Sequence, residues 1–282
     1  MQKPPQLTDR DALTRFRARA MKSGHPAMFL QEEAILEVNE RLNEVNRTFK
    51  SVAIVTPFPE IWQKTHPKAK IIPDGEHLAL EKEAFDLVIH AISLHWANDP
   101  VGQMIQCRQA LKPDGLFLAA CFGGETLNEL RTALAEAEVE ISGGLSPRVA
   151  PMGEIRDLGA LLQRAGFAMP VADTDKKSVT YKNMASLVTD LRNMGEVNAM
   201  AHRRKTFTKR AIFKQAEEIY STAFSTSDGR INATFEIIYL TGWAPDESQP
   251  KPLRPGSASA RLADALGSIE SSLPNTAPNK RI

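Results

Sequence analysis

The sequence has only two cysteines, Cys107 and Cys121, among its 282 residues. They form no CxxC pair and no cluster with histidines, which argues against a zinc site and against a disulfide framework. We predict two reduced thiols in a cytoplasmic protein. A net charge is almost absent as well, because 35 Lys and Arg residues balance 34 Asp and Glu residues. The chain as a whole therefore provides no field that would attract nucleic acid or anionic lipid.

Long apolar runs are also missing. No stretch approaches the roughly 18 consecutive apolar residues of a membrane-spanning helix, so we predict no transmembrane segment. The first residues, MQKPPQLTDRDALTRF, lack the apolar region of a secretory signal. The composition is 42% hydrophobic and 24% charged, which is typical of a globular protein that buries one sizeable core.

Strand-like and helix-like segments alternate along most of the chain, which favours an α/β fold with parallel strands. We predict N-terminal helices over residues 1–46, an α/β domain over 47–244 and a mostly irregular tail over 245–282. The predicted strands or extended segments are 52–56, 70–73, 85–94, 116–122, 167–173, 178–181 and 232–243. The predicted helices are 11–22, 28–46, 59–66, 100–111, 125–140, 153–165, 184–194, 208–224 and 261–266.

Several motifs occur together in an order that points to a family. These are FDLVIHAISLHWANDP, ALKPDGLFLAACFGGETLNELR, MGEVNAM and TFEIIYLTGW, in chain order. Over about residues 9–258 the sequence resembles class I S-adenosylmethionine (SAM) methyltransferases. Within them it is most similar to the mitochondrial complex I assembly factors named as arginine hydroxylases, and to their alphaproteobacterial relatives. The order of His95-Trp96, Phe122-Gly123-Gly124 and Gly195-Glu196 is the specific part of this resemblance.

The resemblance implies a Rossmann-like sheet of seven strands with helices on both faces. The last strand, residues 232–243, is expected to be antiparallel and to follow an inserted helical region. SAM is expected over the carboxyl ends of the first strands. A protein substrate or a subunit of a respiratory complex is the partner that the resemblance implies.

The sequence departs from the family where the cofactor is usually held. A glycine turn normally follows the first strand, but no glycine occurs between Val52 and Gly75. Pro57 and Pro59 cannot donate backbone N–H groups. Phe85 lies only 33 positions after Val52, whereas each strand–helix unit takes about 20 residues. We therefore expect a shortened first half, with residues 70–73 as the third strand and the second strand and its helix absent.

Two residues remain as candidates for binding SAM, if SAM binds at all. Thr56 ends the first predicted strand, and Asp74 follows it by 18 residues, near the roughly 20 expected of a ribose-binding acid. The sequence leaves open both an eroded pocket, which the physical argument favours, and an unusual pocket that still works.

The segment after the central strand holds the candidate catalytic residues. His95 is suited to act as a general base, with Asp99 orienting it, while Trp96 and Asn98 would contact the substrate. Alternatively, Asp99 or Asn98 caps the next helix and Trp96 packs against the sheet. His90, inside the strand, is predicted to be a buried and hydrogen-bonded core residue. We predict no metal site.

A second candidate binding segment follows the predicted strand 116–122. Gly123, Gly124 and Glu125 precede a helix, where free N–H groups can bind an anion of the substrate. The alternative is structural, because Thr126 and Glu129 have the spacing of a capping box.

Two further stretches carry positive charge. Ser146 and Arg148 lie in a loop, where Arg148 either grips a carboxylate or phosphate of the substrate or is simply an exposed arginine. Residues 202–205, with Lys209 and Arg210, form the densest basic stretch. It either meets an acidic partner or a membrane, or is a solvated approach to a helix.

Three functions are compatible with these residues. The first is a SAM-dependent methyltransferase, and the second is a protein-modifying or hydroxylating enzyme. The third is a catalytically silent binding factor that assists assembly of respiratory complex I. The missing glycine turn favours the third over the first, so that the chain would be a methyltransferase-family protein with weak or no methyl transfer. The sequence leaves open whether it is an active enzyme.

Overall fold

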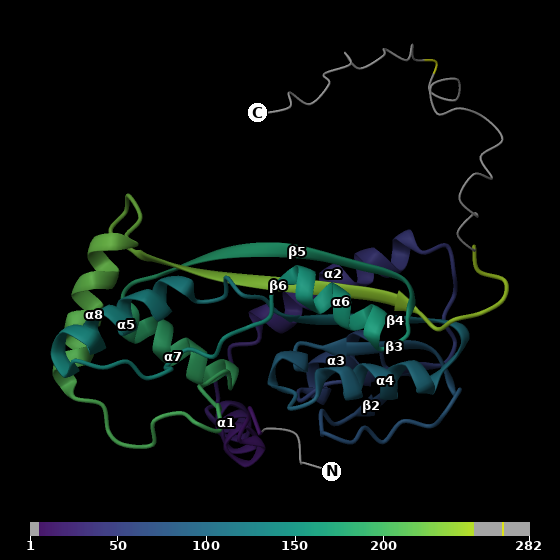
Figure 1. The fold of residues 1–282 in the computed structure, drawn as a ribbon, viewed down its shortest axis with the longest axis horizontal. Helices are drawn as coiled ribbons and strands as arrows, with labels where there is room; N and C mark the ends of the chain where they lie inside the picture. Colours follow the sequence, from purple (N-terminus) through teal and green to yellow (C-terminus); the bar gives the residue numbers. More distant parts are fainter. Residues whose placement is uncertain (1–5, 251–266, 268–282) are drawn as a thin grey trace, which may run out of the picture. The chain divides into compact units, whose positions relative to one another are not determined.

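The structure of the protein is a computed structural model that describes residues 6–250 and Gly267. Residues Met1–Asp246 form one compact unit and Glu247–Ile282 a second. The helices and strands labelled in Figure 1 all belong to the first unit. The helix predicted over 261–266 lies outside the described residues.

Six strands form one sheet in the order β2-β1-β3-β4-β6-β5. Strands β1 to β4 pair in parallel, and β6 runs antiparallel to both of its neighbours. The α/β fold and the antiparallel last strand are thus confirmed. The strands are β1 Val52–Val55, β2 Lys70–Ile72, β3 Phe85–Ala91, β4 Leu111–Phe122, β5 Ala168–Tyr181 and β6 Ile231–Trp243.

Helices connect most of these strands. They are α1 Arg10–Lys22, α2 Phe29–Glu44, α3 Pro59–Thr65, the 3-10 turn η1 Leu94–Trp96, α4 Pro100–Ala110, α5 Asn128–Ser142, α6 Ile155–Arg164, α7 Met184–Met194 and α8 Arg210–Ala223. Local sequence explains several of their boundaries. Asp9 caps α1 by accepting from the Ala12 N–H, and Asn183 begins α7 with a capping box.

The first half of the sheet is shortened, as predicted, but in a different way. Strand β2 pairs directly with β1, which is the position of the second strand in a doubly wound sheet. Its interpretation as the third strand is therefore wrong. Residues 73–84 contain no helix or strand before β3 begins. The described residues form six strands, one fewer than the seven that the resemblance implies, and the missing strand is the outer one beyond β2.

Two segments of the sheet differ from the predicted boundaries. Residues 112–115, which were expected to separate the helix 100–111 from the strand 116–122, lie within β4 as a bulge, because Phe85 pairs with Leu111 and Leu87 pairs with Leu116. The extended segments predicted over 167–173 and 178–181 are joined in one long strand, β5, which begins at Ala168. That strand is continuous because β6 offers it hydrogen-bonding groups along its whole length.

The sheet separates two hydrophobic cores. Alternating residues of the central strands point to opposite faces, so Ile54 and Ile89 join one core while Val55 and Val88 join the other. Helices α2, α5, α7 and α8 contribute to the first core, and α4 and α6 to the second. Figure 1 shows α5, α7 and α8 together near one end of β5 and β6. Among the described residues no helix combines the length and apolarity needed to cross a membrane.

Candidate functional site

A buried carboxylate lies beside the histidine that follows the central strand. Glu196 comes after α7, whose C-cap residue Gly195 has a positive φ of 76°. Its Oε2 accepts a hydrogen bond from the Trp96 indole N–H at 2.6 Å and lies 3.2 Å from Nε2 of His95. The side chains of His95 and Glu196 are 2% and 9% exposed. The Glu196 carboxylate, which follows α7, thus contacts both His95 and Trp96 of η1.

The charge of Glu196 is stabilised in spite of its burial. Burial alone would raise the pKa of Glu196, but the hydrogen bond and attraction of His95 and the attraction of Arg17 outweigh it and lower that pKa. Arg17 Nη2 lies 3.6 Å from Glu196 Oε1, beyond normal hydrogen-bond length. Glu196 therefore remains an anion with one oxygen anchored. Within the described chain, its other oxygen accepts no hydrogen bond.

The predicted partnership of His95 with Asp99 is wrong. Asp99 Oδ1 accepts from the Gly102 N–H at 2.7 Å and caps α4, whose first residue is Pro100. The capping alternative is therefore confirmed for Asp99. The carboxylate that orients His95 is that of Glu196.

Helix α1 connects this carboxylate to a second one. Nη1 of Arg17 pairs with Oδ2 of Asp74 at 2.6 Å, and Arg10 approaches the same oxygen at 3.3 Å. Arg17 is only 7% exposed. It thus lies between Asp74 and Glu196, and α1 covers the carboxyl ends of β1 and β2.

Thr56 and Asp74, the predicted cofactor residues, line a common cavity of about 630 Å³ with Pro57, Arg10 and Arg17. The cavity lies beyond the carboxyl ends of β1 and β2, where this type of fold binds nucleotides. The structure thus brings the two predicted residues together. It also shows that the Asp74 carboxylate is already paired with two arginines of α1.

The turn after β1 has no unused backbone donor from Thr56 to Pro59. The Thr56 N–H donates to the Ile72 carbonyl at 3.0 Å, and the Phe58 N–H donates to Thr56 Oγ1 at 3.1 Å. The remaining two residues are prolines, which have no N–H. This turn therefore does not fit the usual way of holding SAM, in which glycine N–H groups approach the methionine part.

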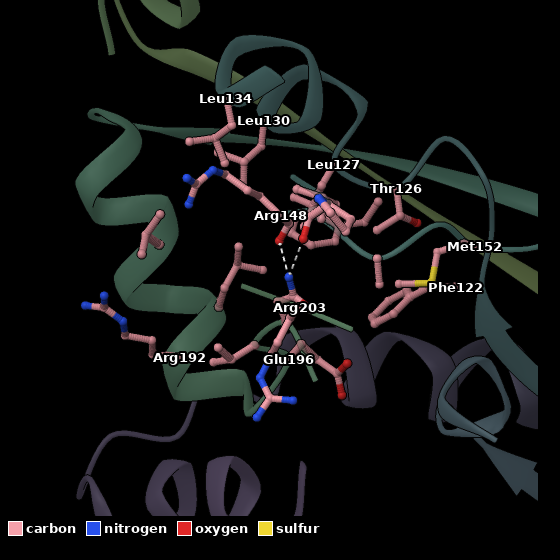
Figure 2. Close-up of a pocket in the computed structure, with 18 of the residues that line it drawn as sticks. Phe122, Thr126, Leu127, Leu130, Leu134, Arg148, Met152, Arg192, Glu196 and Arg203 are labelled. Atoms are coloured by element: carbon pink, nitrogen blue, oxygen red, sulfur yellow. Dashed lines mark hydrogen bonds between the residues drawn. The ribbon is translucent and has the colours of Figure 1, made fainter. Parts of the chain in front are cut away.

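A second cavity of about 370 Å³ lies on the other side of Glu196. Figure 2 shows Leu127, Leu130 and Leu134 on one side of it and Glu196 and Arg203 on the opposite side. Trp96 also lines this cavity, hereafter the acceptor pocket. Its walls are mostly apolar, with Glu196 as the one acidic residue among the described residues that line it and with Arg148, Arg192, Arg203 and Arg204 as basic residues. Next to Glu196, such a pocket can take a ligand with an apolar stem and a cationic end.

The predicted anion site at Gly123, Gly124 and Glu125 is filled by the protein itself. Glu236 of β6 accepts from the Glu125 N–H at 2.9 Å through its side chain, and from the Gly123 N–H at 2.9 Å through its carbonyl. A Cβ on Gly123 would lie 2.5 Å from Glu236, and one on Gly124 would lie 2.2 Å from Glu154. These glycines make room for internal carboxylates.

The capping-box alternative for the same segment is also wrong. Helix α5 begins at Asn128, after Leu127 in a left-handed conformation. Thr126 donates to the Glu236 carbonyl, whereas Glu129 accepts from the Thr234 N–H and hydroxyl. Both side chains fasten α5 to β6 instead of capping the helix.

Ser146 and Arg148, predicted to bind substrate, form a cluster around Glu138 of α5. The Ser146 hydroxyl lies 2.7 Å from Glu138 Oε2, and Arg148 donates from Nε at 3.0 Å and from Nη2 at 2.7 Å. The third nitrogen of Arg148 donates to Thr208 Oγ1. Arg148 lines the acceptor pocket, but each of its nitrogens already has a protein partner.

The remaining candidates of the central segment have internal partners. Asn98 Oδ1 accepts from the N–H groups of Leu7 and Thr8 at 2.7 and 2.8 Å and so fixes the N-terminal segment. His90 lies 2.8 Å from Gln103 Oε1 in the core, as predicted. Burial lowers the pKa of His90 to about 4.

One cluster among the described residues has the geometry to hold a metal ion. It consists of Glu33, Glu37 and Asp175. Lys177 pairs with Glu33 and Asp175, and Arg41 pairs with Glu37. Each carboxylate of the cluster therefore already has a cationic side chain of the protein as its partner.

Sequence reasoning missed the roles of Glu196 and Arg17. The sequence did contain a signal for Glu196, because Gly195-Glu196 is one of the motifs whose order makes the family resemblance specific. A Cβ on Gly195 would lie 2.9 Å from Cγ of Arg17, so this glycine also lets α1 approach. Arg17 is one of several arginines on α1, and no sequence pattern distinguishes it from the others.

Comparisons with known proteins agree with this architecture. Residues 37–119 match the model of the methyltransferase-domain family. The mitochondrial arginine hydroxylase NDUFAF5 of Danio rerio is 42% identical over 207 residues, covering 73% of this chain and 64% of the relative. The human protein of the same name is 41% identical over 208 residues, covering 74% and 60%.

A bacterial methyltransferase is also similar. The malonyl-[acyl-carrier protein] O-methyltransferase of Xylella fastidiosa is 33% identical over 180 residues, covering 64% of this chain and 59% of the relative. The chain spans less than two thirds of the length of each of these three relatives. The sheet order, the family match and these identities agree that the chain contains a methyltransferase domain of the class I SAM-dependent type.

Proposed function

We propose that this protein is a protein-modifying assembly factor that receives an arginine side chain of a partner in the acceptor pocket. The observation that carries the proposal is the buried Glu196 carboxylate in a mostly apolar cavity of about 370 Å³. Arginine has an aliphatic stem and a planar cation that pairs strongly with carboxylates. The name of the NDUFAF5 relatives, arginine hydroxylase, supports the same substrate class.

The geometry around Glu196 supports a guanidinium ligand. Trp96 and His95 fix Oε2, so the orientation of the carboxylate is set before a ligand arrives. Oε1 accepts no hydrogen bond within the described chain, but it is buried and the Arg17 guanidinium lies near it, so an incoming donor has to open this contact to reach it. Three of the four arginines that line the pocket have acidic partners, since Arg148 and Arg204 share Glu138 and Arg203 pairs with Asp9. Their charges therefore repel a cationic substrate less than isolated arginines would.

Weak or absent methyl transfer is the second part of the proposal. It is supported by the lack of a free N–H in the turn after β1 and by the pairing of Asp74 with Arg17. Isothermal titration with SAM tests it, because tight and saturable binding would contradict this part without touching the arginine site. The partner is a subunit of respiratory complex I, as the resemblance implies, and the setting is the cytoplasm.

Titration with N-acetylarginine amide tests the arginine site directly. We expect saturable binding that is at least tenfold weaker for the uncharged isostere N-acetylcitrulline amide, because a charge-assisted pair is lost. Glu196→Gln should abolish the difference between the two probes. Glu136→Gln, an exposed residue of α5, is the matched control and should bind like wild type. Equal affinity of the wild type for both probes would contradict the proposal.

The role in assembly needs a cellular measurement. Deletion of the protein in its source organism should reduce the amount of assembled complex I on native gels. Mass spectrometry of complex I subunits should then reveal an arginine that loses the mass of an added oxygen. If both the assembly of complex I and the arginine masses are unchanged, the assignment of the partner is refuted.

A further inference from the structure

The segment of residues 202–214 concentrates positive charge on a protein that has almost none overall. It contains six Lys and Arg residues and no acidic residue, whereas the whole chain has a net charge of +1. In Figure 1 this segment is the green stretch that leads into α8, together with the first turn of that helix. We refer to it as the basic segment.

Internal ion pairs use only part of this charge. Arg203 pairs with Asp9 at 2.9 Å, and Arg204 pairs with Glu138 at 3.2 Å. Lys205, Lys209 and Arg210 are exposed, and within the described part of the chain they make no ion pair. These three cations are therefore available to an external anion.

The basic segment also exposes aromatic side chains. Phe207 is 101% exposed and Phe213 is 42% exposed, although both are large apolar residues. Phe207 lies between Lys205 and Lys209 in the sequence, so cations flank it on both sides. A fully solvated phenylalanine gains free energy only when it leaves water, which indicates a partner that buries it.

We propose that the basic segment is a docking surface for anionic phospholipid membranes, into which Phe207 inserts. Phosphates of the membrane surface attract clustered Lys and Arg residues, and an aromatic residue at the same place supplies the apolar contact. An acidic protein fits less well, because the cores of protein interfaces are depleted in lysine and other charges, whereas Phe207 is surrounded by them. Such binding is peripheral and needs no membrane-spanning helix.

The position of the basic segment gives this docking a consequence. Arg203, Arg204 and Phe213 line the acceptor pocket as well as belonging to the segment. Docking therefore brings the acceptor pocket close to the membrane surface, where a membrane-associated partner is met. The docking surface itself rests only on charge and exposure, and it does not depend on which side chain enters the pocket.

Vesicle flotation with the full-length protein tests the proposal. We expect binding to vesicles of phosphatidylcholine and phosphatidylglycerol in equal parts, release at high salt, and no binding to phosphatidylcholine alone. Neutralising the free cations, as in Lys205→Gln with Lys209→Gln and Arg210→Gln, should weaken binding roughly a hundredfold. Phe207→Ser should weaken it roughly tenfold.

Matched controls separate the basic segment from general effects. Lys64→Gln with Lys68→Gln and Lys82→Gln removes the same charge from exposed sites outside the segment, and Leu36→Ser removes an exposed apolar residue of α2. Both should bind vesicles like wild type. Equal loss in these controls, no binding of wild type to anionic vesicles, or an unchanged affinity of Phe207→Ser would overturn the proposal. Stronger binding to soluble polyglutamate than to vesicles would assign the segment to an acidic protein instead and would likewise overturn it.

Discussion

Replacing Glu138 by glutamine should destabilise the protein in a pH-dependent way. Glu138 is 2% exposed and is contacted by Ser146, Arg148 and Arg204. Burial opposes its ionisation, but the hydrogen bonds from Arg148 and Ser146 outweigh burial and lower the pKa of Glu138 from 4.5 to about 2. The carboxylate is therefore stabilised in the folded state relative to the unfolded chain.

The size of the effect follows from this difference. A fall of the pKa from 4.5 to about 2 corresponds to about 3 kcal/mol of stability at neutral pH. Arg204 is 39% exposed, so solvent reaches the cluster and screens it, and we expect a loss of about 2 kcal/mol in Glu138→Gln. For a domain of this size that loss lowers the melting temperature by roughly 4–8 °C.

The pH dependence distinguishes this mechanism from a general packing defect. Because the folded pKa of Glu138 is depressed, its contribution is complete above the unfolded pKa and disappears as the pH falls through the folded value. Wild type and Glu138→Gln should therefore differ at pH 7 and converge as the pH falls from about 5 toward about 2. Urea denaturation across this range measures the difference, with Glu136→Gln as the control. A difference in unfolding free energy that stays constant over the whole range would refute the reasoning.

Two further predictions concern the supports of the site. Asp99→Ala removes the N-cap of α4 and should cost about 1 kcal/mol in urea denaturation while leaving the affinity for N-acetylarginine amide unchanged; a large loss of that affinity would restore Asp99 to the site. Gly195→Ala places a Cβ 2.9 Å from Arg17 at a φ of 76° and should cost at least about 2 kcal/mol. Gly229→Ala has the same strain at a φ of 77° with nothing within 4 Å, so an equal loss there would show that Arg17 is not involved.

The local elements were predictable because their signals lie close together in the sequence. The apolar run of β3 predicted a central strand, and proline and glycine predicted most helix boundaries. The bounds of α7 were predicted to the residue, because Asn183 and Gly195 are strong capping residues at its two ends. The missing glycine turn after β1 was also readable directly, and with it the shortened first half of the sheet.

Pairings between distant side chains were not predictable in this way. His95 and Glu196 are 101 positions apart, and Gly123 and Glu236 are 113 apart. Spacing along the chain therefore suggested the nearer Asp99 as the partner of His95. For the N–H groups of Gly123 and Glu125 it suggested an external anion. The folded chain supplied internal carboxylates in both places, because buried donors must find an acceptor and β6 or α7 brought one within reach.

The sequence by itself determined the fold family, the order of strands and helices and the absence of glycine after β1, since each depends on residues that are near one another. Tertiary structure decided which carboxylate lies against His95, that Arg17 lies between Asp74 and Glu196, and that the acceptor pocket is mostly apolar around one anion. These features depend on how α1, α7 and the sheet pack together, and no local pattern of residues fixes that packing.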